Sequence, residues 1–122
     1  MTAHEGQHLI ADLADCARLD DAGWIEHCLV EAAAAAGATL LEVRLHAFGP
    51  GQGVTGVALL AESHISIHTW PEYGTACVDI FMCGRTDDLD AGLARIVSAL
   101  GGLVRRRTLL TRCFGVVPAH SA

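Results

Sequence analysis

Residues 54–83 read VTGVALLAESHISIHTWPEYGTACVDIFMC, and this stretch contains three runs that are typical of β-strands. The runs cover residues 54–62, 63–70 and 75–83. Pro71 and Gly74 interrupt the pattern between the second run and the third, which predicts a turn there. Three short strands in close succession favour an antiparallel sheet.

The middle run carries an unusual number of polar side chains. Side chains of a strand alternate between its two faces. One face therefore holds Ser63, Ile65 and Ile67, and the other holds His64, Ser66 and His68. A strand that only packs against a core does not need so many polar groups, so this run is a candidate functional segment.

The rest of the chain adds strands and two helices. We expect strands over residues 7–15, 39–48 and 103–113, helices over about 22–36 and 88–100, and a turn at 49–53. Asp20 and Asp21 predict the start of the first helix, and Gly37 predicts its end. The second helix should begin near Asp87, Asp88 and Asp90 and end at Gly101 and Gly102. Strands dominate, so we predict an α+β fold: a two-layer sandwich in which two helices cover one face of a largely antiparallel sheet, within a single domain of residues 1–122.

Composition excludes several classes of protein. The formal net charge is −6, and the only basic cluster is Arg105–Arg107, so nucleic acid is not an expected partner. No run of 18 apolar residues occurs, so we expect no membrane span. A chain of 122 residues buries only a modest core, and dimerisation would help its stability.

The chain has five cysteines, an odd number, and no Cys-x-x-Cys pair. They lie at positions 16, 28, 77, 83 and 113. Without a recognisable signal peptide, this pattern predicts reduced thiols in a cytoplasmic protein rather than a disulfide framework. Apart from Cys83, discussed below, we expect these cysteines to be packed as small apolar side chains.

Two histidines on one strand face also suggest a metal site. His64 and His68, with Cys77 or His46 as a third ligand, would supply suitable donor atoms. Residues four apart on a strand lie about 13 Å from one another, which is too far for one ion. We therefore expect no metal.

Three segments together, GQHLIADL, HAFGPGQGVTGVALLAESHISIHTWPEYG and DIFMCG, resemble the bacterial and archaeal S-adenosylmethionine decarboxylases. The resemblance covers nearly the whole chain except the last twenty residues. It implies that the Glu62–Ser63 bond cleaves itself and that Ser63 becomes a pyruvoyl group. The products would be one chain of residues 1–62 and another of residues 63–122.

The chemistry of such a cleavage explains the residue types. Decarboxylation of an amino acid needs an electron sink, and no natural side chain offers a carbonyl group. The Ser63 hydroxyl would attack the Glu62 carbonyl and turn the peptide bond into an ester. Loss of the serine α-proton would expel the ester, and hydrolysis would leave pyruvoyl and ammonia. In turnover the pyruvoyl carbonyl would form a Schiff base with the substrate amine.

The resemblance also implies roles for other residues. His68 would remove the serine α-proton, Thr55 would assist cleavage, and Cys83 would return a proton to the substrate α-carbon. Phe48 would stack on adenine, and Glu72 would bind the ribose hydroxyls. We expect Trp70 to be a packing residue.

The chain departs from the family at two places near the substrate. Thr75 replaces a usual tyrosine, and the turn at residues 49–53 is one residue longer. The resemblance therefore does not predict the shape of the pocket wall at these two places.

Geometry favours a site shared between two chains. His68 lies five positions after Ser63, so on a regular strand the two side chains face opposite ways. The family forms homodimers with active sites at the interface. We therefore expect Ser63 and Cys83 from one chain to meet Phe48, Thr55, His68 and Glu72 from the other.

Three functions fit these residues. The first is decarboxylation of S-adenosylmethionine to an aminopropyl donor for spermidine and other polyamines. The second is pyruvoyl-dependent decarboxylation of another amino acid, such as ornithine or arginine. The third is a relative that never cleaves and serves as a binding or regulatory module.

Overall fold

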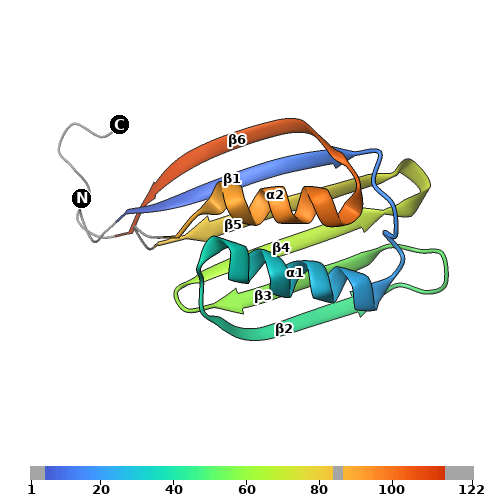
Figure 1. Ribbon diagram of the computed structural model, residues 1–122, viewed down its shortest axis with the longest axis horizontal. Coiled ribbons are helices and arrows are strands. Elements are labelled where there is room, and N and C mark those ends of the chain that lie inside the picture. Colours follow the sequence, from blue (N-terminus) through green and yellow to red (C-terminus); the bar gives the residue numbers. More distant parts are fainter. Residues whose placement is uncertain (1–4, 84–86, 115–122) are drawn as a thin grey trace.

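The computed structural model describes residues 5–83 and 87–114 as one six-stranded sheet with two helices on one face (Figure 1). The elements are β1 (Glu5–Ala14), α1 (Ala22–Ala36), β2 (Leu40–Ala47), β3 (Val54–Leu60), β4 (Ser63–Trp70), the short 3₁₀ helix η1 (Pro71–Tyr73), β5 (Thr75–Met82), α2 (Leu89–Leu100) and β6 (Leu103–Cys113). The strand order is β2-β3-β4-β5-β1-β6, and all five neighbouring pairs are antiparallel. The predicted fold class is confirmed.

Both long helices begin and end where their caps predict. The Asp21 side chain accepts a hydrogen bond from the Trp24 backbone N–H at 3.0 Å, and Asp88 does the same for Ala91. Gly37 and Gly101 then adopt φ values of 79° and 65°, a left-handed conformation that glycine reaches at little cost. The helix over 22–36 matches its prediction at both ends. The second helix begins one residue later than predicted, because Asp88 is its cap rather than its first residue.

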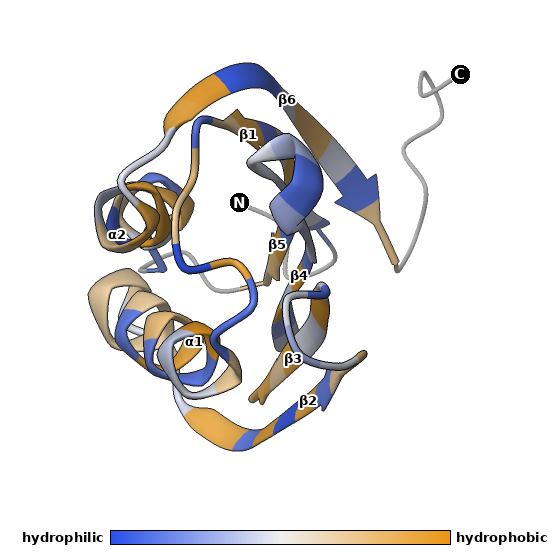
Figure 2. Cartoon of the chain, turned by 90° about the vertical axis from the view of Figure 1, so that its right-hand side faces the viewer, coloured by the Kyte–Doolittle hydropathy of each residue, from blue (hydrophilic) through white to orange (hydrophobic). Residues whose placement is uncertain are grey.

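The core lies between the two helices and one face of the sheet. Alternate residues of four strands are fully buried there, among them Leu9, Val54, Ile65, Ile67 and Ile80. The helices contribute Ile25, Leu29, Ile96 and Leu100. Seen from the side, α1 and α2 both lie on the same side of the sheet (Figure 2). Neither of them covers the other face, which we call the open face.

The open face carries the residues that alternate with the core residues. Its central strands present His64, Ser66 and His68 from β4 and Cys77, Asp79 and Phe81 from β5. Apolar side chains also lie on this face, since Ile10, Leu59 and Leu110 are 40%, 42% and 43% exposed. Exposed apolar side chains gathered on one face are typical of an interaction surface.

A buried threonine fixes the loop between β2 and β3. The Thr69 hydroxyl accepts a hydrogen bond from the Val54 backbone N–H at 2.8 Å and donates one to the Leu19 carbonyl at 2.7 Å. A Cβ atom on Gly53 would lie 2.1 Å from the Thr69 carbonyl oxygen, so only glycine fits. The loop that contains Gly53 closes with a 3.1 Å hydrogen bond from the Phe48 N–H to the Gly53 carbonyl. These contacts place Phe48 beside the ends of β3 and β4.

All five cysteines are free, but they are not all packed as predicted. Cys28 is fully buried, whereas Cys113 is exposed. Cys113 is the last residue of β6, an edge strand whose residues are all exposed. The prediction of a buried thiol was therefore wrong for Cys113. Within residues 5–83 and 87–114, neither long helix is long and apolar enough to cross a membrane.

Candidate active site

The predicted cleavage bond lies in a tight turn between β3 and β4. Leu60 pairs with Ser63, so only Ala61 and Glu62 form the connection. Glu62 has a φ of 61°, a conformation that glycine or asparagine normally supplies in such a turn. A residue with a larger side chain is strained there by about 1–3 kcal/mol. The backbone is thus strained at the residue whose carbonyl precedes Ser63.

Cys83 contacts both sides of this bond. Its backbone N–H donates to the Ser63 hydroxyl oxygen at 3.3 Å, and its thiol donates to the Glu62 carbonyl oxygen at 2.9 Å. A donor on a carbonyl oxygen stabilises the negative charge that develops there when a nucleophile attacks. The structure therefore brings Glu62, Ser63 and Cys83 together at the start of β4.

The thiol of Cys83 is suited to donating a proton. Partial burial raises the pKa of this thiol, and the nearby charges of Glu62 and Asp87 raise it further. The Ser63 hydrogen bond opposes this change only in part. Cys83 therefore keeps its proton at neutral pH.

The other four predicted site residues line one cleft at the opposite end of β4. The cleft has a volume of about 500 Å³, and Phe48, Thr55, His68 and Glu72 all contribute to its wall. Thr55 Oγ1 lies 3.1 Å from Nδ1 of His68, which fixes the orientation of the imidazole ring. Phe48 is 56% exposed, so its ring is available for contact rather than packed in the core.

Trp70 also lines this cleft, with its ring centroid 6.3 Å from that of His68. Trp70 is 38% exposed, so it packs at the edge of the cleft rather than in the core, and its packing role stays a prediction. Thr75 does not line the cleft; its hydroxyl donates to the Tyr73 carbonyl at 3.3 Å.

The two groups lie far apart within one chain. The register of β4 with β3 and with β5 runs without a shift, so no bulge turns His68 toward Ser63. Ser63 shares the face of Ile65 and Ile67, which pack under the helices, whereas His68 lies on the open face. Five residues of strand span about 17 Å. His68 therefore does not reach the Ser63 of its own chain.

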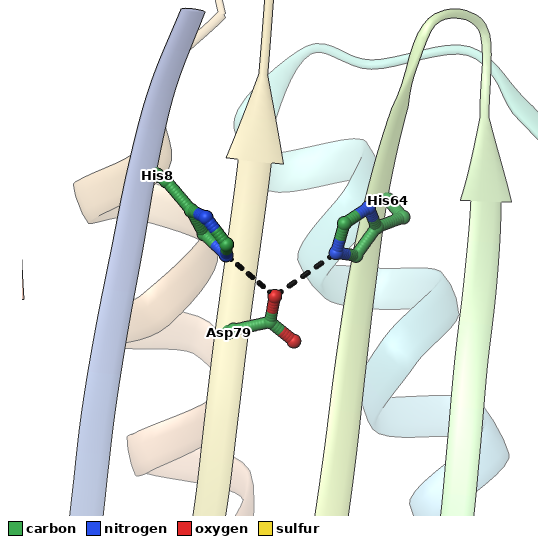
Figure 3. A group of neighbouring side chains, drawn as sticks. All are labelled: His8, His64 and Asp79. Carbon is green, nitrogen blue, oxygen red and sulfur yellow. Dashed lines mark hydrogen bonds and ion pairs between the residues drawn. The ribbon is translucent and has the colours of Figure 1, made fainter. Parts of the chain in front are cut away.

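A third polar cluster, which the sequence did not predict, lies on the open face near the start of β4 (Figure 3). Asp79 Oδ2 accepts hydrogen bonds from Nε2 of His8 at 2.7 Å and from Nε2 of His64 at 2.9 Å. Ser66 donates to the other carboxylate oxygen, and Arg112 donates to Nδ1 of His8 at 3.0 Å.

These contacts also set the charge state of Asp79. Burial by itself raises the pKa of this carboxyl, but the hydrogen bonds from Ser66, His64 and His8 outweigh burial and leave the pKa below its usual range. Asp79 is therefore ionised at neutral pH. His8 and Asp79 are 71 residues apart, and only the pairing of β1 with β5 brings them together.

The three ligand atoms of His8, His64 and Asp79 lie within 4.8 Å of one another, a spacing that suits a metal ion. His64 and His68, the pair rejected from the sequence as too far apart, do not converge in the structure either, and His68 contacts Thr55. The structure thus contains a candidate metal-binding group that differs from the one considered from the sequence.

Comparisons with known proteins identify the family and the fold. A family model described as S-adenosylmethionine decarboxylase matches residues 7–112. Relatives named S-adenosylmethionine decarboxylase proenzyme include one from Parasynechococcus marenigrum, 60% identical over 81 residues that make up 65% of this chain and 62% of the relative. Another, from Methanococcus aeolicus, is 58% identical over 84 residues, or 67% of this chain and 71% of the relative.

A third proenzyme of that name, from Pseudomonas paraeruginosa, is 49% identical over 96 residues, or 76% of this chain and 58% of the relative. The matched part of this chain therefore spans less than two thirds of some of these relatives. Among solved structures, the adenosylmethionine decarboxylase from Aquifex aeolicus superposes with a TM-score of 0.77 at 34% identity, covering 98% of both chains.

Proposed function

The chain belongs to the S-adenosylmethionine decarboxylase family, and we propose that it is a pyruvoyl-dependent decarboxylase of S-adenosylmethionine that cleaves itself between Glu62 and Ser63. The observation that carries this proposal is the contact of Cys83 with both residues of that bond. The product would be decarboxylated S-adenosylmethionine, the aminopropyl donor for spermidine and other polyamines.

Cleavage would begin with attack of the Ser63 hydroxyl on the Glu62 carbonyl carbon. The Cys83 thiol already donates to the Glu62 carbonyl oxygen and would stabilise the charge that forms there. The Glu62–Ser63 peptide bond becomes an ester, and the strain at Glu62 favours its opening. Removal of the Ser63 α-proton then expels the Glu62 carboxylate, and water releases ammonia from residue 63.

His68 is the proposed base for that proton. Because Thr55 engages Nδ1 of His68, Nε2 is the ring nitrogen that would accept the proton. Thr55 supports cleavage through this contact. Both residues would act on the Ser63 of a second chain, since their own Ser63 lies about 17 Å away along the strand.

The pyruvoyl group at residue 63 would supply the carbonyl that accepts the electrons released with carbon dioxide. Residue 63 lies beside Cys83, whose thiol is protonated at neutral pH, so the chain fits such a group. Cys83 would donate its proton to the substrate α-carbon once the carboxyl group has left.

The cleft at the other end of β4 is the proposed adenosine site. Its volume of about 500 Å³ lies within the range of small-molecule pockets. Phe48 offers an exposed ring on which adenine can stack, and the Glu72 carboxylate can accept hydrogen bonds from both ribose hydroxyls. The cationic side chain of ornithine or arginine could also pair with Glu72, but only adenosine offers a purine ring for Phe48 together with a diol for Glu72, so the two residues together favour S-adenosylmethionine.

A homodimer completes this site. The open face presents apolar side chains, so a second copy with β4 reversed would pack there and set the Ser63 end of one β4 beside the cleft of the other. Because the Ser63 side chain points to the helix-covered face, residue 63 would reach the partner's cleft from the end of the strand. The proposed enzyme functions in the cytoplasm, since five free thiols are typical of a reducing compartment.

The denatured mass of the purified protein tests the proposal. We expect two pieces, residues 1–62 and 63–122, with the second lighter than its sequence by the mass lost when serine becomes pyruvoyl. A single chain of 122 residues after long incubation would contradict self-cleavage and favour a binding module. Release of carbon dioxide from labelled S-adenosylmethionine, ornithine and arginine then tests the substrate, and a preference for either of the last two would contradict the adenosine site.

A further inference from the structure

The residue that follows the cleavage bond has its side chain fixed. His64 lies on the open face, and its Nε2 donates to Asp79 Oδ2 at 2.9 Å. Asp79 belongs to β5, the strand that leads to Cys83 four residues later. The contact therefore joins the strand that carries residue 63 to the strand that leads to its proposed proton donor.

This contact gains importance when the chain is cut. In the uncut chain, the turn through Ala61 and Glu62 holds Ser63 from one side and β4 holds it from the other. After cleavage, residue 63 would be a chain end, and ends of strands fray because few contacts hold them. The His64 side chain is then the fixed group nearest to the new end.

Asp79 is a firm anchor because several neighbours hold it. Ser66 donates to one carboxylate oxygen and His8 donates to the other. His8 is itself held by Arg112 from β6. The side chain of Asp79 is 24% exposed and that of His64 is 37% exposed, so this contact is partly shielded from water.

We propose that Asp79 and His64 are positioning residues, whose hydrogen bond holds residue 63 opposite Cys83 before cleavage and during turnover. This inference rests on the proposed function, because it gives residue 63 a reacting role. Neither residue touches the reacting atoms, since both side chains lie on the face opposite to that of Ser63.

The chain offers a matched control for this proposal. His8 and His64 both donate to the same oxygen of Asp79, from the two strands that flank β5. Only His64 is adjacent to Ser63 in the chain. A role in charge balance or folding predicts similar effects for the two histidines, whereas a positioning role predicts a difference.

The experiment compares the rate of self-cleavage of freshly made His64→Ala and His8→Ala by denatured mass. We expect cleavage of His64→Ala to slow by about tenfold to a hundredfold, as expected for loss of a hydrogen bond to a charged group. His8→Ala should slow cleavage less, by about threefold at most, because Ser66 and His64 still hold Asp79 when His8 is absent. His64→Gln, which keeps an N–H donor, should recover part of the lost rate, and in matured protein His64→Ala should lower kcat more than it raises KM.

The outcomes separate this inference from the proposed function. An unaltered chain that never cleaves would contradict the proposed function itself. An unaltered chain that cleaves, with equal losses in His8→Ala and His64→Ala, would overturn the positioning role alone. Thermal unfolding of both variants in a Ser63→Ala background, where cleavage is blocked, should give similar midpoints; a much lower midpoint for His64→Ala would assign its effect to folding and overturn the inference.

The same cluster also fits a metal ion, and the experiment distinguishes the two cases. Arg112 donates to Nδ1 of His8, which places the ring proton of His8 on Nε2, the atom that faces Asp79. A metal would need that atom unprotonated. We therefore expect a chelator to leave cleavage unchanged; loss of cleavage that zinc restores would overturn the proposal in favour of a metal site.

Discussion

The two ends of β4 carry two different kinds of site. At the Ser63 end, backbone geometry dominates: a strained two-residue turn, a backbone N–H and a thiol surround one peptide bond. At the Trp70 end, side chains from a loop and three elements form an open cleft of about 500 Å³. The first end surrounds the bond that would be cleaved, whereas the second offers the cleft proposed for adenosine and carries His68, the proposed base for the Ser63 of a second chain.

The difference teaches how covalent chemistry and binding can be separated in so small a chain. Residues that must meet a single bond are placed by strand register, because register fixes atoms closely. Residues that must surround a ligand lie on a loop and a 3₁₀ helix, which can differ in length without moving the strands. The following experiments test this division, beginning with the largest expected effect.

Two variants that each fail to cleave should cleave again when they form a mixed dimer. Ser63→Ala lacks the nucleophile and His68→Ala lacks the base, so each variant alone should remain almost entirely uncut. When both are produced together, each mixed dimer has one site with an intact Ser63 and an intact His68, so fragments should appear in the denatured mass spectrum. Mixed dimers that form but contain no fragments would contradict a shared site.

The recognition end should affect binding without affecting cleavage. Glu72→Gln removes the charge that would accept the ribose hydroxyls, a change that typically costs about 1.5–3 kcal/mol. We expect KM to rise by about tenfold or more, while the extent of self-cleavage stays unchanged. Glu26→Gln, at an exposed position of α1, is the control and should change neither quantity. A cleavage defect in Glu72→Gln would show that the two ends are not separate.

Release of strain at the covalent end should slow cleavage. Glycine adopts a positive φ at little cost, so Glu62→Gly keeps the turn while it removes about 1 kcal/mol of strain. If that strain helps to open the bond, cleavage should slow by up to about fivefold. Asp15→Gly is a matched control, because Asp15 also has a positive φ, of 57°, but lies in another loop. Equal cleavage rates for Glu62→Gly and the unaltered chain would exclude a contribution from strain.

The smallest effect concerns acid stability at the Ser63 end. The lowered pKa of Asp79 means that the folded chain favours the ionised carboxyl, so its contribution to stability is present above the usual carboxyl pKa, about 3.9. That contribution is lost as pH falls through the lower pKa of the folded state. In a Ser63→Ala background, Asp79→Asn should therefore lose less stability than its parent as pH falls below about 4. Parallel loss of stability in urea titrations of both proteins would contradict this expectation.

Local signals in the sequence were sufficient for the elements and for the face on which each residue of β4 lies. Asp21 and Gly37 set the first helix because their effects depend on the neighbouring residues alone. The alternation of residues 63–68 was sufficient to place His68 on the face opposite Ser63, and the register confirms that no bulge intervenes. The grouping of Glu62, Ser63 and Cys83 was expected from the family resemblance.

Contacts between distant segments could not be predicted in the same way. The cluster of His8, His64 and Asp79 depends on β1 lying between β5 and β6, and no local pattern specifies that strand order. The exposure of Cys113 depends on β6 being an edge strand beyond the cover of the helices. Trp70 was expected to pack, and its place at the edge of a cleft depends on the neighbouring loop at residues 48–53, which no local pattern puts there.

The strand order has a consequence for the matured protein. Cleavage after Glu62 would leave β1, β2 and β3 in one fragment and β4, β5 and β6 in the other, and the order β2-β3-β4-β5-β1-β6 interleaves them. The fragments would share three strand junctions, so neither can leave without dismantling the sheet. The uncut chain can refold by itself, but two fragments must first find each other at a rate that depends on their concentration. Maturation would thus turn a folding reaction of one chain into an assembly of two chains that depends on their concentration.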